Sequence, residues 1–524
     1  MIVIGAGVAG LGSALALSRA GHRVTLIERD ATPLPADPDA AFEWDRRGAP
    51  QVRHSHALLA RLRNLLRDRY PDVLADLLAA GATELRFTED LPVDITDRAA
   101  RPGDDDLVAL ACRRTTFEWV LRRTVLATEG VTILDGTVAE ALVTEPASVT
   151  EPAPTGGRNR AAGVPTVTGV RVAPNRGAVQ TLAADLVVAA LGRRSAVPRL
   201  LSQIGVDPIG TSEDTGIIYL SRFYRLLADA EPPPAAGPIG GDLGYLKYAV
   251  FQGDNRTFSV TFAIGTHDDE LRLLLLDPLG FDAAAGALPA TAGWVEVDRA
   301  GAITDVHVMG GLLNRKLDFV DDAGAPLVLG FHVAGDAHTC TNPLYGRGCS
   351  LAMVQATLLA DALAAHPDNP VARSVAYEQA SEREIRPWYV AALTQDRMNR
   401  EATETEASAS ASDADASAEV DAAPDTEPDP DVDVDVEVDP KAFMRDLMRN
   451  GLMPAVRTDA TVFRAFVRAF NLLDPPDAVM ANPDVISRVM AAYAERDARP
   501  PEAPLGPPRH ELIATLRGTE VSAG

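Results

Sequence analysis

Four residues near the N-terminus have the types and spacing of a phosphate-binding turn. Gly5, Gly7 and Gly10 form the pattern G-x-G-x-x-G, and Glu28 follows about twenty residues later. Gly5 permits a tight turn, Gly7 lets backbone N–H groups approach a pyrophosphate, and Gly10 lets a helix pack close to a strand. The Glu28 carboxylate can accept hydrogen bonds from ribose hydroxyls. The pattern predicts a dinucleotide site and leaves open whether FAD or NAD occupies it.

The residues around this pattern predict the elements that must position it. The apolar run 2–4 is typical of a buried parallel strand, residues 11–20 predict a helix that ends at Gly21, and residues 24–27 predict a second strand. The N-terminus of that helix offers unpaired N–H groups to phosphates. The alternative is a structural glycine turn in another α/β fold.

A second glycine-rich segment lies far downstream. Gly335 and Asp336 follow a predicted strand that begins at Leu327 and runs towards Ala334, and a predicted helix covers residues 351–365. Asp336 at the end of a strand is well placed to hold a polyol hydroxyl. NAD has no ribityl chain, so a second site of this kind favours a flavin.

The two patterns together resemble the group A flavoprotein monooxygenases, which have the para-hydroxybenzoate hydroxylase-like fold. The resemblance implies that Asp336 binds the ribityl chain of FAD and that Arg114 contacts the flavin. The segment 185–195 looks like the middle motif of the family but lacks the acid that usually precedes Gly192. Further residues that the resemblance places beside the isoalloxazine ring are Pro343, Gly346 and Gly348.

Residues 47–59 resemble a bacterial subgroup that includes polyether-type epoxidases. In that subgroup the segment approaches the flavin, which makes His54 and His56 candidates for flavin or substrate contact. Tyr345 and Arg347 are candidates because they lie within the loop that the resemblance places beside the ring. Packing within the loop, or a solvated histidine pair, is the alternative for each of these residues.

Metal binding and thiol chemistry receive less support. His54-x-His56 could form a metal pair, but no nearby Cys or third His completes a ligand set and no H-E-x-x-H occurs. We therefore expect no metal. Cys340 and Cys349 flank the flavin loop and could form a redox pair or a covalent flavin link. Packing as small buried hydrophobic residues is the favoured interpretation.

The middle of the chain predicts a β-sheet domain. Residues 216–224, 245–251 and 257–264 are typical of strands, and residues 253–255 predict the turn between the last two. In the resembling family this sheet covers the flavin and binds the substrate. Its aromatic residues could line an apolar pocket or pack the core of the sheet, and they are Tyr219, Phe223, Tyr248, Phe251, Phe258 and Phe262.

The chain has 524 residues and a formal net charge of −25, and residues 401–440 hold 15 acidic residues with no Lys or Arg. This composition predicts a disordered, solvated linker. A calcium loop over 431–439 is the alternative, but it lacks the spacing of an EF-hand. Residues 441–500 predict a helical appendage, because Val462, Phe466 and Phe470 share one helix face and Asn482-Pro483 begins another helix.

The expected fold class is α/β, with a Rossmann-like FAD-binding domain, an interleaved β-sheet substrate domain and a C-terminal helical appendage. The FAD-binding domain is discontinuous, and residues 145–165 predict a surface insertion within it. The expected boundaries are 1–85 with 105–200 and 321–395 for the FAD-binding domain, 86–104 with 201–320 for the substrate domain, 396–440 for the linker, 441–500 for the appendage and 501–524 for a tail.

Composition argues against several classes of partner and location. The negative charge opposes binding to nucleic acid or to an anionic membrane. Three cysteines suit a reducing compartment, and we expect a cytoplasmic protein. The apolar N-terminus could suggest a signal peptide, but it has no basic segment and glycines interrupt it. No stretch in the sequence predicts membrane insertion.

The resemblance implies an FAD-dependent monooxygenase that uses NAD(P)H and O₂. Such an enzyme epoxidises or hydroxylates an apolar small molecule through a flavin hydroperoxide. Two alternatives remain. One is an FAD-dependent dehydrogenase or reductase of the same fold, such as a prenyl-chain reductase. The other is a flavin-binding sensor or accessory protein, which the altered middle motif and the acidic segment make conceivable.

Overall fold

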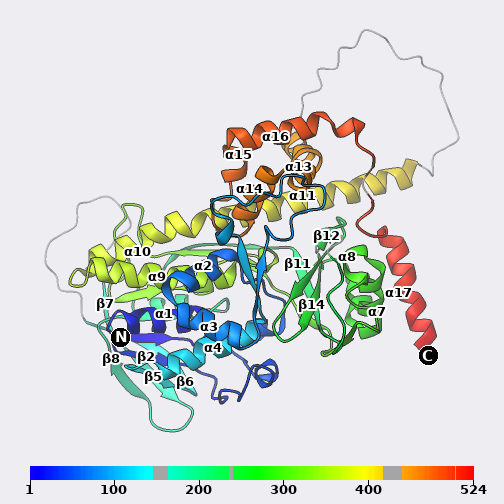
Figure 1. Cartoon of the computed structure of the whole chain (residues 1–524). Helices are drawn as coiled ribbons and strands as arrows, with labels where there is room; N and C mark the ends of the chain where they lie inside the picture. Colours follow the sequence, from blue (N-terminus) through cyan, green and yellow to red (C-terminus); the bar gives the residue numbers. More distant parts are fainter. Residues whose placement is uncertain (146–162, 235–239, 417–439, 502, 524) are drawn as a thin grey trace.

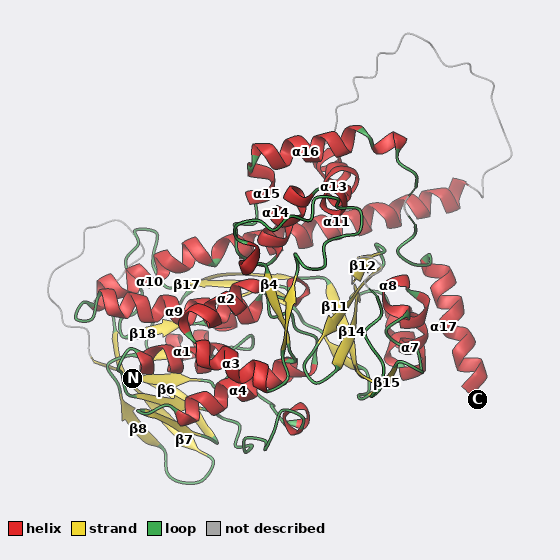
Figure 2. Cartoon of the chain, viewed as in Figure 1, coloured by secondary structure: helices red, strands yellow, loops and turns green. Residues whose placement is uncertain are grey.

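A computed structural model of the chain describes residues 1–145, 163–234, 240–416, 440–501 and 503–523. It has an N-terminal α/β part, a second β-sheet beside it, and a group of C-terminal helices above a long helix that crosses the molecule (Figure 1). Figure 2 shows the same arrangement coloured by secondary structure.

A five-stranded parallel sheet lies at the centre of the α/β part. Its strands, in spatial order, are β18 (Phe331–Val333), β9 (Val187–Ala189), β1 (Ile2–Ile4), β2 (Val24–Ile27) and β5 (Val131–Leu134). All four neighbouring pairs are parallel. The two predicted N-terminal strands are confirmed. The strand predicted from Leu327 is shorter, because Leu329 forms only an isolated bridge with Thr166.

The two faces of this sheet are covered by different layers. On one face Val3, Leu26 and Val188 pack in the cluster that holds α1 (Val8–Arg19), α4 (Arg114–Ala127) and α9 (Gly348–Ala365). On the other face Ile2 and Ile4 pack against an antiparallel sheet. That sheet comprises β6 (Thr137–Glu145), β7 (Thr166–Pro174) and β8 (Gln180–Ala183). Because side chains alternate along β1, Val3 faces the helices, and Ile2 and Ile4 face the antiparallel sheet.

Helix α9 packs along α1 in the centre of this domain. In the part of the chain that the structure describes, α9 alone is long and apolar enough to cross a membrane, but 67% of it is buried inside the protein. A core helix of a globular domain has these properties.

The second sheet is antiparallel, with strands β12 (Gly240–Asp242), β13 (Leu246–Gln252), β14 (Thr257–Gly265), β11 (Ile217–Leu226) and β15 (Ala300–Ala302) in that order. The short strand β16 (His307–Met309) also pairs with β11. One face of the sheet packs against α6 (Asp269–Leu276), α7 (Pro278–Ala287) and α8 (Pro289–Ala292). The three strands predicted here and the turn at 253–255 are confirmed.

The remaining elements include α2 (Ala60–Arg69), α3 (Pro71–Ala79), β3 (Thr83–Arg86), β4 (Val108–Ala111), α5 (Val197–Ser202), β10 (Ile209–Asp214), β17 (Leu313–Asp318), β19 (Thr339–Cys340) and α10 (Pro370–Glu384). Their strands form two small antiparallel sheets, β3–β4 and β10–β17–β19.

The first part of the expected linker is helical in the structure. Helix α11 (Arg386–Ala416) continues through the first part of the acidic segment, so residues 396–416 are helical and Asp396 is buried. Residues 417–439, with the sequence considered as a calcium loop, lie outside the described residues, as do residues 146–162 of the expected surface insertion.

The predicted helical appendage is confirmed and forms a small bundle above α11 (Figure 1). It contains α12 (Pro440–Leu447), a π-helical turn (Met448–Leu452), α13 (Met453–Thr458), α14 (Ala460–Phe470), α15 (Ala478–Ala481) and α16 (Pro483–Ala494). The Asn482 side chain caps α16 as expected. Leu91 and Ile95 pack in this bundle, although the expected boundaries grouped 86–104 with the substrate sheet. The domain boundaries themselves stay a prediction.

The expected C-terminal tail contains a docked helix. Helix α17 (Arg509–Ala523) packs against α7, beside the second sheet (Figure 1). Leu512 and Leu516 have no exposed surface and belong to the apolar cluster beneath the sheet. The description of this segment as a tail was therefore wrong for the helical residues.

Candidate cofactor site and adjoining cavity

The N-terminal glycines form a turn that larger residues could not form. Gly5 has φ +100°, and a Cβ on Gly10 would lie 1.7 Å from the Gly5 carbonyl oxygen. A Cβ on Gly7 would meet nothing within 4 Å, so open space lies beside the N-terminus of α1. No side chain caps this helix. A helix N-terminus without a cap beside open space is suited to an anionic group such as a phosphate.

Glu28 lies at the end of β2 and is bonded to this turn. One of its carboxylate oxygens accepts a hydrogen bond from the Ala6 N–H over 2.8 Å, and the other accepts from the Asp30 N–H over 2.9 Å. Arg46 donates to the Ala6 carbonyl over 2.9 Å and forms a buried ion pair with Glu118 at 2.6 Å. Arg46 could not be identified from the sequence, because its partners come from distant segments.

The second glycine-rich segment meets the first one. A Cβ on Gly335, at φ +66°, would lie 2.5 Å from the Cβ of Ala9, so this turn packs directly on the first turn of α1. The N–H of Gly335 donates to the side chain of Gln355 on α9 over 2.7 Å. Burial raises the pKa of Asp336, while the nearby Arg114 acts to lower it. The structure thus brings Gly5, Gly335 and their neighbouring acids to one edge of the parallel sheet.

Arg114 connects this edge to the start of α9. It begins α4, is buried, and lies 3.1 Å from Glu118 and 3.0 Å from the Cys349 sulfur. Burial raises the pKa of the Cys349 thiol, as it does for Cys340. Both cysteines are free and buried, in agreement with the expected packing role.

The segment that contains the two candidate histidines packs against the loop 343–347. A Cβ on Gly346, at φ +65°, would lie 2.8 Å from the Cβ of Ala57. His56 donates from Nδ1 to the His54 carbonyl over 2.9 Å, and burial lowers the pKa of each imidazole to about 3. Both histidines are therefore neutral near pH 7. Within the described residues, no group of three His, Cys, Asp or Glu side chains could hold a metal.

His54 begins a chain of hydroxyl groups on the second sheet. Its Nδ1 lies 3.2 Å from the Ser221 hydroxyl, which lies 2.8 Å from that of Thr261. Ser55 then bridges Thr261 and Ser259, at 2.5 and 2.6 Å. These hydrogen-bonded groups form a polar stripe on the face of the second sheet opposite its apolar core.

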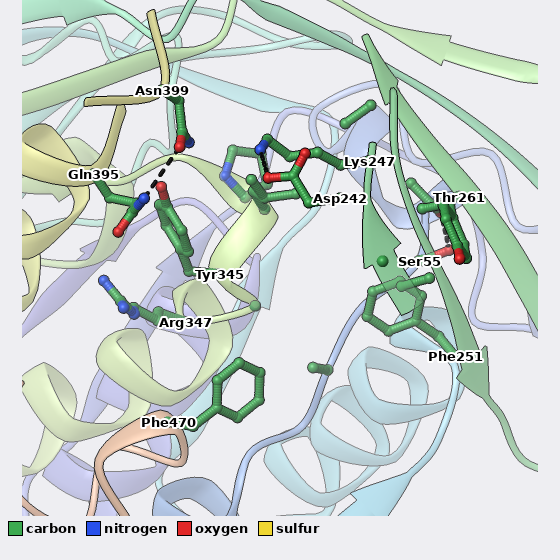
Figure 3. Close-up of a pocket in the computed structure, with 18 of the residues that line it drawn as sticks. Ser55, Asp242, Lys247, Phe251, Thr261, Tyr345, Arg347, Gln395, Asn399 and Phe470 are labelled. Atoms are coloured by element: carbon green, nitrogen blue, oxygen red, sulfur yellow. Dashed lines mark hydrogen bonds and ion pairs between the residues drawn. The ribbon is translucent and has the colours of Figure 1, made fainter. Parts of the chain in front are cut away.

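A cavity of about 480 Å³ lies in front of this face. The second sheet, the loop 343–347, α11 and the C-terminal bundle all contribute to its wall. Figure 3 shows Tyr345, Arg347 and Gln395 on one side of the cavity and Phe251, Ser55 and Thr261 on the other. Residues of the bundle that line it are Met448, Leu452, Phe466, Ala469, Phe470, Pro476, Val479 and Met480.

The aromatic residues of the second sheet divide between its two faces. Tyr219 and Phe251 line the cavity, whereas Phe258 and Phe262 pack in the core beneath the sheet. Tyr248 belongs to the core and also reaches the cavity. The pocket interpretation therefore applies to Tyr219 and Phe251, and the core interpretation applies to Phe258 and Phe262.

Asp396 on α11 organises the loop at the cavity. Its carboxylate accepts hydrogen bonds from the Tyr345 hydroxyl at 2.8 Å, the Asn342 side chain at 2.9 Å and the Asn314 side chain at 2.6 Å. Burial raises its pKa, and the three donors act in the opposite direction. From the sequence, Asp396 was expected to lie in a disordered linker, because no local pattern distinguishes it from the acidic residues that follow.

Arg347 lines the same cavity. Its guanidinium carbon lies 4.6 Å from the centre of the Tyr345 ring and 5.1 Å from that of Trp388. One terminal nitrogen donates to the Trp388 carbonyl over 3.1 Å, and burial lowers the pKa of the guanidinium to about 10. Of the four candidate residues, His54, Tyr345 and Arg347 line the cavity, while His56 lies behind it beside Arg114.

Comparison with known proteins supports this description of the fold. The family of pyridine nucleotide-disulphide oxidoreductases matches residues 1–47. No curated protein matches the chain.

Several solved structures are similar to most of the chain. The p-nitrophenol 4-monooxygenase PnpA from Pseudomonas putida DLL-E4 is 17% identical, with a TM-score of 0.55, and the match covers 90% of this chain and 97% of that one. The anhydrotetracycline hydroxylase OxyS from Streptomyces rimosus is 17% identical, with a TM-score of 0.51 and coverage of 90% and 76%. PqsL, a probable FAD-dependent monooxygenase from Pseudomonas aeruginosa, is 18% identical, with a TM-score of 0.50 and coverage of 77% and 95%.

These identities are low, so the matches establish the architecture and leave the substrate open. The parallel sheet, the two glycine turns at its edge and the second sheet beside them all occur in one chain. The protein therefore has an α/β fold with a parallel, Rossmann-like sheet, and it shares this fold with the p-nitrophenol 4-monooxygenase PnpA and with PqsL, a probable FAD-dependent monooxygenase.

Proposed function

We propose that the protein is an FAD-dependent monooxygenase that uses NAD(P)H and O₂ to hydroxylate or epoxidise a small molecule. The observation that carries this proposal is the contact between the two glycine turns. Gly335 packs on Ala9, and the partly buried Asp336 lies at the same sheet edge as the open space beside Gly7. A dinucleotide that also carries a ribityl chain needs both turns.

The residues present fit such a group. The uncapped N-terminus of α1 suits the pyrophosphate, Glu28 suits the ribose of the adenosine, and Asp336 suits the ribityl hydroxyls. When bound, FAD would supply the redox chemistry, accepting a hydride from NAD(P)H and activating O₂. The chain itself binds and orients the reactants.

The cavity supports a substrate with a large apolar part. The C-terminal bundle covers it with side chains such as Phe466 and Met480, and the second sheet forms the opposite wall. A mostly apolar wall excludes water from the reacting atoms, which matters for oxygen transfer because water competes for reactive intermediates. The polar stripe from His54 to Ser259 offers hydrogen bonds to one end of a substrate.

The test is aerobic turnover with ¹⁸O₂. Purified protein should contain FAD, and a panel of phenols and alkenes should include a compound that stimulates NAD(P)H oxidation and gains one ¹⁸O atom. Asp336→Ala should purify without flavin, whereas Asp322→Ala, a change to an exposed acid, should retain it. Product formation that persists at full rate without O₂ would instead identify a dehydrogenase or reductase. Flavin binding without any NAD(P)H oxidation would identify a sensor or accessory protein.

A further inference from the structure

Arg347 is an unbalanced positive charge in the wall of the cavity. Three residues with formally charged side chains line the cavity, and two of them, Asp242 and Lys247, form an ion pair with each other. Across the described ranges of the chain, Arg347 has no carboxylate within ion-pairing distance. A cation in a low-dielectric site without a counter-ion is unfavourable, and the lowered pKa of Arg347 reflects this cost.

Asp396, the nearest acid in the network, acts to raise the pKa of Arg347 but forms no ion pair with it among the described residues, and burial still lowers that pKa overall. Asp396 is already committed to Tyr345, Asn342 and Asn314, and burial raises its pKa. The guanidinium also has N–H donors that make no hydrogen bond within the described residues. Its Nε–H is buried without a partner, and among the hydrogen bonds of the described residues it makes one, from Nη1 to the Trp388 carbonyl.

The guanidinium is nevertheless held in place. The rings of Tyr345 and Trp388 lie near its carbon, at 4.6 and 5.1 Å, and Tyr345 is itself fixed by Asp396. A planar guanidinium with free donors and a fixed position is suited to a carboxylate, because the two groups can form parallel hydrogen bonds. The rest of the wall is apolar on the side of Phe466 and Phe470.

We propose that Arg347 binds a carboxylate on the substrate, so that the cavity takes an apolar organic acid. This inference rests on the proposed function only in calling the ligand a substrate. Binding of the acid itself requires neither reduction nor O₂. The carboxylate would lie against the loop 343–347, and the apolar part would extend along the wall formed by the C-terminal bundle and the second sheet.

A matched pair of probes tests the proposal. We would titrate the full-length protein, as purified, with 2-naphthoate and with 2-naphthamide in a calorimeter at pH 7. The two probes share an apolar ring system and differ in charge. Wild-type protein should bind naphthoate at least about tenfold more tightly than naphthamide, which corresponds to about 1.4 kcal/mol. Arg347→Gln should lose that preference and bind naphthamide within about twofold of wild type.

Two further variants make the result specific. Lys247→Gln removes the other cation in the wall and should keep the preference, because Lys247 is already paired with Asp242. Arg347→Lys keeps the charge without the planar donor pair and should show an intermediate preference. The FAD content of each variant is measured alongside.

Four results of the titrations would overturn the proposal. They are equal affinities of wild type for the two probes, no naphthoate binding at millimolar concentration, equal losses for both probes in Arg347→Gln, and loss of the preference in Lys247→Gln. Loss of FAD in Arg347→Gln would assign the residue to the cofactor and would also overturn it. If the proposed function itself were wrong, wild-type protein would lack flavin or would not consume O₂.

Discussion

The hydroxyl of Tyr345 donates a hydrogen bond to a carboxylate oxygen of Asp396 over 2.8 Å, although the two residues are 51 positions apart. The same carboxylate accepts from Asn342 and Asn314. Helix α11 therefore holds the loop that borders both the glycine turns and the cavity. The acid is a positioning residue, because it does not itself line the cavity.

Replacing Asp396 should loosen this loop. Asp396→Ala leaves two buried amide donors and the partly buried Tyr345 hydroxyl without their acceptor, at a cost of about 1–3 kcal/mol for each buried group left unsatisfied. We expect a lower free energy of unfolding and weaker FAD binding, measured by urea unfolding and by flavin fluorescence titration. Thr394→Ala, an exposed change on the same helix, is the control. Equal stability and FAD affinity in the two variants would refute the positioning role.

Two glycines of the first turn should respond differently to the same substitution. Gly10→Ala places a Cβ 1.7 Å from the Gly5 carbonyl oxygen, so we expect poor folding or a large loss of stability. Gly7→Ala meets no protein atom within 4 Å and should fold normally while binding FAD at least about tenfold more weakly. Thermal unfolding of the flavin-free protein and FAD titration separate the two effects. Normal FAD affinity in Gly7→Ala would place the phosphates elsewhere.

A buried ion pair connects the start of α4 to the second sheet. Arg113, just before α4, pairs with Asp254 in the β13–β14 turn at 2.6 Å, and neither side chain has more than 1% of its surface exposed. Asp254→Ala leaves the buried Arg113 guanidinium with only Asp39, an exposed carboxylate at 3.3 Å, and should cost about 3–5 kcal/mol of stability. The exposed pair of Arg69 and Asp361 is the control, and Asp361→Ala should cost less than about 1 kcal/mol. Similar losses in both variants would show that burial of the Arg113 pair contributes little.

Buried histidines should make the protein sensitive to acid. Burial lowers the pKa of His332 from 6.5 to about 3, so between these values the unfolded state binds a proton that the folded state does not. His332 therefore contributes stability that is present above pH 6.5 and is lost as the pH falls towards 3. His332→Phe should flatten the decline in unfolding free energy between pH 7 and pH 5 by up to about 1.4 kcal/mol per pH unit.

The control for this measurement is His510→Asn, since the His510 side chain is 82% exposed. This variant should follow the wild-type curve. A decline that is just as steep in His332→Phe would show that other groups carry the acid sensitivity.

The C-terminal helix should stabilise the second sheet. Leu512 on α17 has no exposed surface and packs in the core beneath that sheet. Leu512→Ala should cost about 2–5 kcal/mol in the unfolding of this region, as core truncations do. Thr515→Ala, on the exposed side of α17, should have little effect on the melting curve. An unchanged melting temperature in Leu512→Ala would mean that α17 does not dock in solution.

Local rules explain what the sequence alone could predict. The turn at Gly5 and Gly10 depends on backbone conformation and close approach within a few residues, so its pattern is visible in the sequence. The same is true of Asn482 as the cap of α16. These features need no knowledge of distant partners.

Features that depend on distant partners could not be predicted in this way. Arg46, Asp254 and Asp396 became significant only when folding placed Glu118, Arg113 and Tyr345 beside them. The sequence did contain a signal for helix α17, which was expected to be part of a tail. Leu512 and Leu516 are spaced by four residues and follow Pro508, a pattern that indicates a short amphipathic helix.

The order of strands in the parallel sheet sets an order of events in folding. Strand β1 comes first in the chain but lies in the middle of the sheet, where Val3 pairs with both Leu26 and Val188. The edge strand β18, with Phe331 paired to Val187, comes much later. Parallel pairings this far apart in sequence form slowly, because long loops must close first. A chain truncated before Phe331 would leave β9 as an open, apolar edge, so it should aggregate rather than fold as a smaller domain.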